Sequence, residues 1–420
     1  MSFLDRTAEK LFFKTLTGLK HGSLEIHYQG KRFLFGAQDD PLRAIVDVRH
    51  PSFFRKAVLA GDTGIGEAYM DGDWTSPDVG CVIRIAIRNM NHLESSNAWF
   101  SALSRCANRV KHLLRSNSIT GSKKNIAAHY DLSNEFFKLF LDESMMYSCA
   151  WFHQAGDSLE QAQWNKLDRI CRKLDLKPGE NILEIGTGWG SFALHAAKYY
   201  GVHVTTTTIS REQHALASER FNAFDPEGSS IQLLMEDYRN LTGTFDKLVS
   251  IEMFEAVGLD FYDQFFSTCD RLLKPNGALC MQTITLLDQN FPAYHQSSDW
   301  IQKYIFPGGE LASVSRILQS LERATKLTLY SVEDMGTHYA RTLAEWRLRF
   351  LDRIQAVHDL GFDTRFIRMW EFYLHYCEGA FLERHASTVQ LMMIKTHAQQ
   401  DFSGEPWNAT TRFKMEFTKK

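Results

Sequence analysis

The stretch Asn181-Ile-Leu-Glu-Ile-Gly-Thr-Gly-Trp-Gly decides the fold of this chain. Its first half is a short apolar run that is typical of a buried parallel strand, and Ser191-Phe-Ala-Leu-His-Ala-Ala-Lys after it indicates a helix. Gly186, Gly188 and Gly190 let the backbone turn tightly and approach a ligand with no side chain in the way. The stretch therefore predicts a nucleotide-type binding loop.

The spacing of these glycines distinguishes between cofactors. A dinucleotide loop needs G-x-G-x-x-G/A, and here Ser191 stands at the sixth position. Glu184 precedes the first glycine, where it would repel a pyrophosphate but suits S-adenosylmethionine, a sulfonium cofactor with an ammonium group and no phosphate. These residues favour S-adenosylmethionine over NAD. The alternative is a glycine-rich loop that only turns the chain.

Strands and helices alternate around the loop. We predict a helix over 157–174 and further strands over 202–209, 231–235, 245–251 and 277–285. This order is typical of an α/β fold with an open, mostly parallel Rossmann-like sheet, in which ligands bind at the carboxyl ends of the strands. We expect this catalytic domain over residues 125–400, followed by a tail over 401–420.

The first 95 residues predict a small α+β domain without a catalytic constellation of its own. An amphipathic helix is expected over 3–19, and two short alternating stretches over 24–28 and 32–35 predict a hairpin. Residues 61–74 contain several glycines and aspartates, so we expect them to be rich in turns.

A basic segment over 96–124 joins the two parts. It contains no acid, and its cations are Arg105, Arg109, Lys111, Arg115, Lys123 and Lys124. With apolar residues on one face, it predicts an amphipathic helix followed by a linker. Two interpretations stay open, a helix packed between domains with a solvated basic side, or a helix that docks on anionic lipid.

Composition narrows the class of protein. A chain of 420 residues exceeds one ordinary domain, and a net charge of −3 argues against bulk binding of nucleic acid. The seven cysteines are odd in number and form no C-x-x-C pair, so we expect no disulfide framework, no metal site and a reducing cytoplasm. The sequence also lacks an apolar signal segment and any run of about 18 apolar residues.

Several motifs, in order, resemble the cyclopropane fatty acid synthase family over residues 120 to 395. They are Asn125-Ile-Ala-Ala-His-Tyr-Asp-Leu-Ser-Asn, Met146-Tyr-Ser-Cys-Ala-Trp-Phe, Leu183-Glu-Ile-Gly-Thr-Gly-Trp-Gly, Met253-Phe-Glu-Ala-Val-Gly, Trp300-Ile-Gln-Lys-Tyr-Ile-Phe-Pro-Gly-Gly, Tyr339-Ala-Arg-Thr-Leu-Ala-Glu-Trp and Arg368-Met-Trp-Glu-Phe-Tyr-Leu-His-Tyr-Cys-Glu-Gly-Ala-Phe. The resemblance implies a class I methyltransferase sheet with helical lid insertions. The N-terminal part resembles the smaller domain of bacterial members that act on phospholipids.

The resemblance implies methyl transfer from S-adenosylmethionine to a cis double bond of a phospholipid acyl chain. The carbocation that follows needs a dry, aromatic-lined cavity, and a base must then remove a proton so that a cyclopropane ring closes. In the family this base is a bicarbonate ion. Carried over by motif, its site would use Cys149 (mainly its backbone), Glu255, Ile284, Tyr339 and Cys377. The family has histidine where this chain has Gln282, which can donate a hydrogen bond but cannot relay a proton.

The resemblance also assigns residues to the cofactor. They are Tyr147 and Ser148 near the methionine end, Gly186, Gly188 and Gly190 beneath it, Thr208, Ile209 and Gln213 beside the ribose, and Asp237 and Tyr238 around the adenine. Structural roles are the alternatives, with Cys149 and Cys377 as inert core thiols, Tyr339 as a rim residue and Glu255 as a helix-opening acid.

Other functions stay open at this level. The same carbocation can undergo a hydride shift and give a methylene or methyl branch. Gln282 in place of histidine is the feature that suggests this alternative. A non-catalytic lipid-binding protein and a small-molecule methyltransferase are further alternatives. We expect acyl chains and an anionic membrane surface as partners, peripheral attachment at the inner face of the membrane and, by resemblance, a homodimer.

Overall fold

The computed structural model describes residues 3–90, 92–93, 132–224, 228–297, 299–396 and 398. The basic segment over 96–124 and the tail over 401–420 lie outside the described residues, so the expectations for them stay predictions.

A seven-stranded sheet of order β10-β11-β9-β8-β5-β6-β7 organises the larger part of the chain. Its strands are β5 (Asn181–Ile185), β6 (His203–Thr207), β7 (Ser230–Leu234), β8 (Phe245–Ile251), β9 (Leu273–Leu286), β10 (Leu327–Asp334) and β11 (Ala386–Lys395). The first five are parallel to their neighbours among themselves, and β11 runs antiparallel to β9 and β10. The predicted α/β sheet is confirmed.

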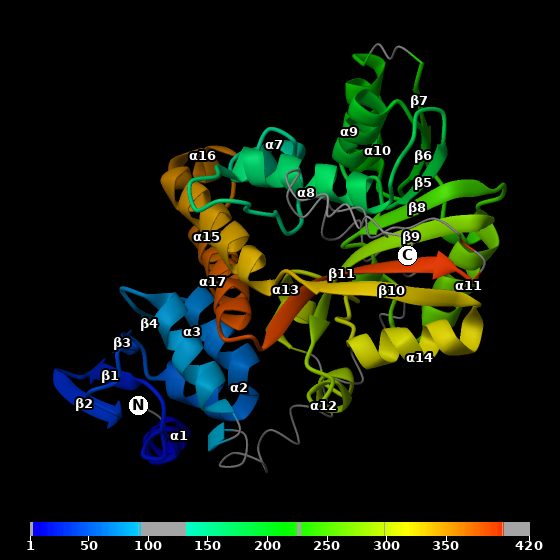
Figure 1. Cartoon of the computed structure of the whole chain (residues 1–420). Coiled ribbons are helices and arrows are strands. Elements are labelled where there is room, and N and C mark those ends of the chain that lie inside the picture. Colours follow the sequence, from blue (N-terminus) through cyan, green and yellow to red (C-terminus); the bar gives the residue numbers. More distant parts are fainter. Residues whose placement is uncertain are drawn as a thin grey trace, which may run out of the picture.

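Alternation along the strands places apolar side chains on both faces of this sheet. Ile182 of β5 packs into one apolar cluster with α8 and α9, whereas Leu183 and Ile185 pack into a second cluster with α11 and α14. Successive side chains of a strand point to opposite faces, so a continuous apolar run requires cover on both sides. Helices lie on both faces of the sheet, as this pattern requires (Figure 1).

The helices of this part of the chain connect the strands or stand before the sheet. They are α7 (Asn134–Lys138), α8 (Leu159–Lys173), α9 (Ser191–Tyr200), α10 (Arg211–Asn222), α11 (Tyr262–Leu272), α12 (Phe291–His295), α13 (Trp300–Tyr304), α14 (Val314–Ala324), α15 (Gly336–Asp352), α16 (Ile354–Asp359) and α17 (Thr364–Leu382). Short 3-10 helices are η1 (Tyr238–Asn240), η2 (Phe254–Ala256) and η3 (Leu259–Phe261).

The N-terminal part has its own four-stranded sheet, of order β2-β1-β3-β4. Its elements are α1 (Phe3–Leu16), β1 (Ser23–Tyr28), β2 (Lys31–Gly36), β3 (Arg43–Val48), α2 (Ser52–Met70), β4 (Trp74–Thr75) and α3 (Val79–Arg88). The expected hairpin is the antiparallel pair β1 and β2.

The expectation of turns over 61–74 is wrong for most of that stretch. Helix α2 continues through it to Met70, and the only non-helical backbone inside the helix is at Gly61, with φ 56° and ψ −131°. Gly64 and Gly66 lie inside the helix at points of close approach. A Cβ on Gly64 would clash with the carbonyl oxygen of Lys56, in the first part of α2. A Cβ on Gly66 would lie 2.5 Å from the Trp300 ring. Close packing, rather than turning, explains these glycines.

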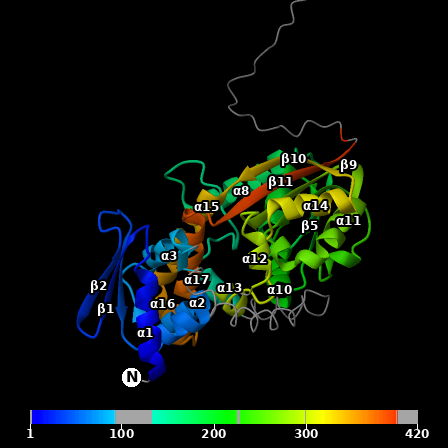
Figure 2. The ribbon, with the colours of Figure 1, turned by 90° about the horizontal axis from the view of Figure 1, so that it is seen from below.

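Helices α15 and α17 lie between the two sheets in both views of the molecule (Figures 1 and 2). Helix α17 packs against α15 and also against α2 and α3. Glu383, at its C-terminal end, pairs with Arg84 at 2.6 Å and with Arg88 at 2.7 Å. Arg368 donates to the carbonyls of Tyr69 and Trp74. One helix therefore ties the N-terminal part to the catalytic sheet.

None of the helices in the described ranges is both long enough and apolar enough to cross a membrane. Within the same ranges, no three His, Cys, Asp or Glu side chains gather in a way that would hold a metal ion.

Candidate active site

A small cavity of about 160 Å³ opens at the carboxyl ends of β5, β6, β7 and β8. All the residues proposed for the cofactor except Gly190 line it, namely Tyr147, Ser148, Glu184, Gly186, Gly188, Thr208, Ile209, Gln213, Asp237 and Tyr238. The edge of a parallel sheet where strands end is the usual ligand site of this fold. The arrangement fits a nucleoside-type cofactor.

The three glycines share a positive φ, but Gly188 and Gly190 have different surroundings. All have positive φ, which is 102° at Gly186, 53° at Gly188 and 89° at Gly190. A Cβ on Gly188 meets no protein atom within 4 Å and would point into open space, whereas one on Gly190 would lie 2.5 Å from the ring of Phe221 on α10. Gly188 therefore leaves room at the cavity, and Gly190 is required by helix packing.

Buried ionisable groups lie around this cavity. Glu184 accepts a hydrogen bond from Thr206 Oγ1 at 2.6 Å, and burial raises the pKa of its carboxyl to about 8. Lys166 of α8 is fully buried and donates to Ser148 Oγ at 2.8 Å, and burial lowers the pKa of its ammonium to about 8. Sequence reasoning missed Lys166, because its helical pattern marks it only as one residue of an amphipathic helix.

Hydrogen-bond donors and acceptors both line the cofactor pocket. Thr208 Oγ1 donates to Gln213 Oε1 at 2.8 Å, which holds two of the residues expected beside the ribose. The carboxylate of Asp237 is paired with Arg239 at 2.6 Å, and Tyr238 is next to it. The donors and acceptors around a glycine-floored cavity suit an adenosine with an amino-acid end.

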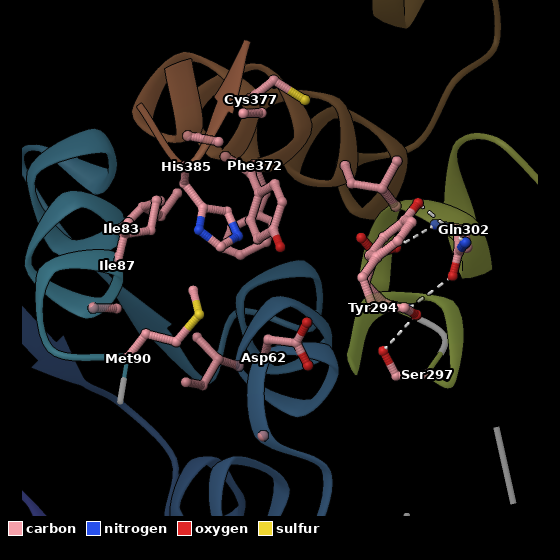
Figure 3. A pocket seen from close by; sticks show the side chains of 18 of the residues that line it. Asp62, Ile83, Ile87, Met90, Tyr294, Ser297, Gln302, Phe372, Cys377 and His385 are labelled. Carbon is pink, nitrogen blue, oxygen red and sulfur yellow. Dashed lines mark hydrogen bonds between the residues drawn. The ribbon is translucent and has the colours of Figure 1, made fainter. Parts of the chain in front are cut away.

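A second cavity, of about 1230 Å³, lies between the N-terminal part and the catalytic sheet. Side chains from α2, α3, α17 and the segment of α12 and α13 surround one space, among them Asp62, Ile83, Tyr294 and Cys377 (Figure 3). Its lining is mostly apolar and includes Phe12, Leu16, Leu24, Ile26, Val46, Phe53, Ala86, Ile87, Phe372 and Phe381. The N-terminal part and the larger part of the chain both contribute to its walls.

The two cavities meet at Tyr147, Glu252 and Ala256, which line both. Aromatic rings surround the junction. The hydroxyl groups of Tyr147 and Tyr373 lie 2.8 Å apart, and the rings of Tyr339 and Phe381 are 4.5 Å apart between centroids. Rings of this kind exclude water and interact favourably with positive charge.

Glu252 is the centre of the polar contacts at this junction. Its Oε1 accepts from the backbone N–H of Cys149 at 2.9 Å and from Gln282 Nε2 at 2.8 Å, and its Oε2 accepts from the Tyr339 hydroxyl at 2.7 Å. The residue follows β8 with φ 47°, a left-handed conformation that is rare for a side chain of this size. The sequence predicts only that the strand over 245–251 ends there, although an acid at the carboxyl end of a parallel strand is a usable signal.

A second buried acid, Glu255, lies three residues further along the chain. Its Oε1 accepts from the backbone N–H of Ile284 at 2.6 Å and from Thr283 Oγ1 at 3.0 Å. Burial, and then the charge of Glu252, raises the pKa of Glu255 to about 8. Burial also raises the pKa of Glu252, while its three hydrogen-bond donors and Lys166 oppose that effect. We therefore assign the negative charge to Glu252 and a neutral carboxyl to Glu255 at neutral pH.

The residues predicted for the anion site separate into three places. Cys149, Gln282 and Tyr339 converge, but on the side chain of Glu252. Glu255 and Ile284 pair with each other. Cys377 stands on α17 in the wall of the large cavity (Figure 3). Burial raises the pKa of both thiols, Cys149 and Cys377, so neither is a thiolate.

The fold and the glycine-floored pocket at its strand ends define an S-adenosylmethionine-dependent methyltransferase. The chain belongs to the mycolic acid cyclopropane synthetase family, whose family model matches residues 117–391.

The similarity to individual relatives extends beyond residues 117–391. The chain is 36% identical over 373 residues to the tuberculostearic acid methyltransferase UfaA1 of Mycobacterium tuberculosis, covering 85% of this chain and 86% of the relative. It is 37% identical over 354 residues to the cyclopropane-fatty-acyl-phospholipid synthase of Escherichia coli, covering 84% and 88%. The crystal structure of mycolic acid cyclopropane synthase CmaA1 complexed with SAH and CTAB matches with a TM-score of 0.61 and 30% identity, covering 65% of this chain and 98% of that one.

Proposed function

We propose that the protein transfers a methyl group from S-adenosylmethionine to the cis double bond of an unsaturated acyl chain in a phospholipid. The observation that carries this proposal is the junction of the two cavities at Tyr147, Glu252 and Ala256. A large, mostly apolar cavity that ends against a cofactor pocket suits an elongated apolar acceptor. The two lipid-modifying relatives support the same class of acceptor.

The glycine-floored pocket is our proposed cofactor site. Bound there, S-adenosylmethionine supplies an electrophilic methyl group. Open space beside Gly188 leaves room for it, and the carboxyl of Glu184 can accept a hydrogen bond from its ammonium group. The remaining pocket residues hold and orient it.

The large cavity positions the acyl chain and excludes water. An alkene is a weak nucleophile, so its double bond must be held in line with the methyl group. Rings of Tyr147, Tyr339 and Phe381 at the junction would stabilise the positive charge that develops on the acyl chain. Apolar walls built by both domains would hold the remainder of the chain.

We propose a cyclopropane ring as the product. After methyl transfer, the added methyl loses one proton, and the electron pair of that C–H bond closes onto the adjacent cationic carbon. The relative from Escherichia coli is named for this product.

A methylene-branched chain is the second candidate product. It forms if hydride first moves from the methyl-bearing carbon to its cationic neighbour, after which loss of a methyl proton gives an exocyclic double bond. Two observations favour it, the similarity to tuberculostearic acid methyltransferase and Gln282 in place of histidine. The same methyl proton leaves in both routes.

We further propose that the protein works at an anionic membrane surface, where its acceptor resides. The cations of the basic segment, Arg105, Arg109, Lys111 and Arg115, support this, each worth about 1 kcal/mol near such a surface. Binding to anionic liposomes should weaken with salt and on changing all four to Gln. Attachment at the inner face and a homodimer stay predictions.

The test incubates purified protein with S-adenosylmethionine and vesicles of dioleoyl phosphatidylglycerol, followed by mass spectrometry of the lipid. We expect a product heavier by one CH₂ group. Ozonolysis distinguishes the candidates, because it cleaves a methylene and leaves a ring intact. Vesicles of the saturated dipalmitoyl lipid should give no product, and methyl transfer to them would contradict the proposal.

A matched pair of variants tests the acyl cavity. Ala86 lines it from α3, whereas Ala215 lies exposed on α10 outside it. Ala86→Trp should lower turnover of the oleoyl lipid about tenfold or more by filling the cavity, with unchanged affinity for S-adenosylhomocysteine. Ala215→Trp should retain wild-type turnover. Equal activity of all three proteins would place the acyl chain elsewhere.

A further inference from the structure

We propose that Glu252 is the general base of this enzyme, and that its carboxylate takes the place of the bicarbonate ion expected from the family resemblance. The inference rests on the proposed methyl transfer to an acyl chain. Three hydrogen-bond donors support it. Cys149 N, Gln282 Nε2 and Tyr339 Oη were expected to hold bicarbonate, and all three bond the side chain of Glu252.

A separate bicarbonate ion does not fit these residues. The donors expected for it are already used by a carboxylate of the chain, at 2.7 to 2.9 Å. A second anion would also stand beside the negative charge of Glu252 in a buried site, where like charges repel strongly. The chain therefore supplies its own anion where the resemblance implies a dissolved one.

One acceptor position of Glu252 remains for a proton. A carboxylate offers about four lone-pair positions, two on each oxygen. Cys149 and Gln282 use both positions of Oε1, and Tyr339 uses one of Oε2. The remaining position on Oε2 belongs to a residue that lines both cavities, and the proposal places it toward the methyl group and the double bond.

The step balances without another reactant. Oε2 of Glu252 takes a proton from the methyl group on the acyl cation, and the C–H electron pair forms the new carbon–carbon bond. The bond closes a ring if the cation is still on the adjacent carbon, and forms a methylene if hydride has shifted. Glu252 becomes a neutral acid and later releases the proton to solvent.

The backbone of Glu252 supports a functional role. Its φ of 47° is unfavourable for any residue with a Cβ, and such strain is found where a side chain must be aimed. Its N–H donates to the Gln282 carbonyl at 2.7 Å, so backbone and side chain are both fixed to the same residue of β9.

The test uses the full chain and three proteins, the wild type, Glu252→Gly and Glu252→Gln. Glycine opens a carboxylate-sized space and leaves the three donors, whereas glutamine fills that space without a base. We expect the wild type to keep its rate, within about twofold, in buffer freed of carbon dioxide. We expect both variants to lose about 100-fold or more in turnover, and formate or bicarbonate to restore part of it in Glu252→Gly only.

A binding measurement provides a readout that does not depend on activity. Titration with ¹³C-formate followed by NMR should show saturable binding to Glu252→Gly and none to the wild type or Glu252→Gln. Affinity for S-adenosylhomocysteine and the Tm check that the variants fold. Saturable binding of formate or bicarbonate to the wild type, or a wild-type rate that falls about tenfold without bicarbonate, would overturn the proposal, as would an active Glu252→Gln. A wild type that binds no anion and methylates no lipid would contradict the proposed function instead.

Discussion

Lys173 donates a hydrogen bond to Oε1 of Gln390 at 2.6 Å, which fixes the direction of that buried amide. With its oxygen turned to Lys173, Gln390 presents Nε2 to Gln282 Oε1 at 2.9 Å. Gln282 in turn presents its own Nε2 to Glu252 at 2.8 Å. A lysine on α8 thus determines, through two amides on paired strands, which group meets the carboxylate.

Gln390→Leu should release this orientation. With its oxygen no longer bonded, Gln282 can rotate, so Glu252 would lose a donor that lowers its pKa. A larger share of Glu252 would then be protonated and unable to accept a proton. We expect kcat to fall about tenfold or more, with KM for lipid and affinity for S-adenosylhomocysteine nearly unchanged. Gln390→Glu keeps the contact to Lys173 but removes the donor, so it should not restore kcat. A rise in KM alone would assign Gln390 to substrate binding.

Glu252→Gly and Glu252→Ala should differ in stability in an unusual direction. Both remove the carboxylate, but alanine retains a Cβ at a φ of 47° and glycine does not. The glycine variant should therefore be more stable than the alanine variant by about 1 kcal/mol in urea unfolding. An alanine variant of equal or greater stability would mean that the backbone relaxes and stores no strain.

Gly188→Ala and Gly190→Ala should separate binding from folding. The added methyl at Gly188 points into the proposed cofactor space, so we expect about a tenfold or greater loss of affinity for S-adenosylmethionine by calorimetry. The methyl at Gly190 would lie 2.5 Å from Phe221, so we expect a loss of about 2 kcal/mol or more in stability. Equal effects of the two changes on binding would contradict this division.

The buried carboxyl of Glu255 predicts a specific pH dependence of stability. Its folded pKa of about 8 lies above the ordinary value of 4.5, so the folded state retains a proton that the unfolded chain releases. This contribution is full below pH 4.5 and is lost as pH rises to 8, at about 1.4 kcal/mol per pH unit. Glu255→Gln carries no such proton, so its stability should gain on the wild type between pH 5.5 and 7.5, by about that slope. Parallel curves for the two proteins would show that Glu255 is ionised throughout.

The sequence predicted the five parallel strands of the large sheet, because a continuous apolar run flanked by glycines leaves few alternatives for β5. It did not predict the antiparallel strands β10 and β11. It also did not predict the helix through Gly64 and Gly66, because the contact of Gly66 with Trp300 depends on tertiary packing. For the candidate site, the motifs placed Gln282 and Tyr339 near one anion. They could not show that Glu252 supplies it, because that depends on how the backbone turns after β8.

Residues of the smaller sheet and its helices form one wall of the large cavity, far along the chain from Glu252. Under the proposed function, substitutions in this wall change which acyl chains fit while the groups at the reacting carbons stay the same. Chain-length preference can therefore diverge among relatives through the first 93 residues alone, independently of the chemistry that the catalytic sheet performs.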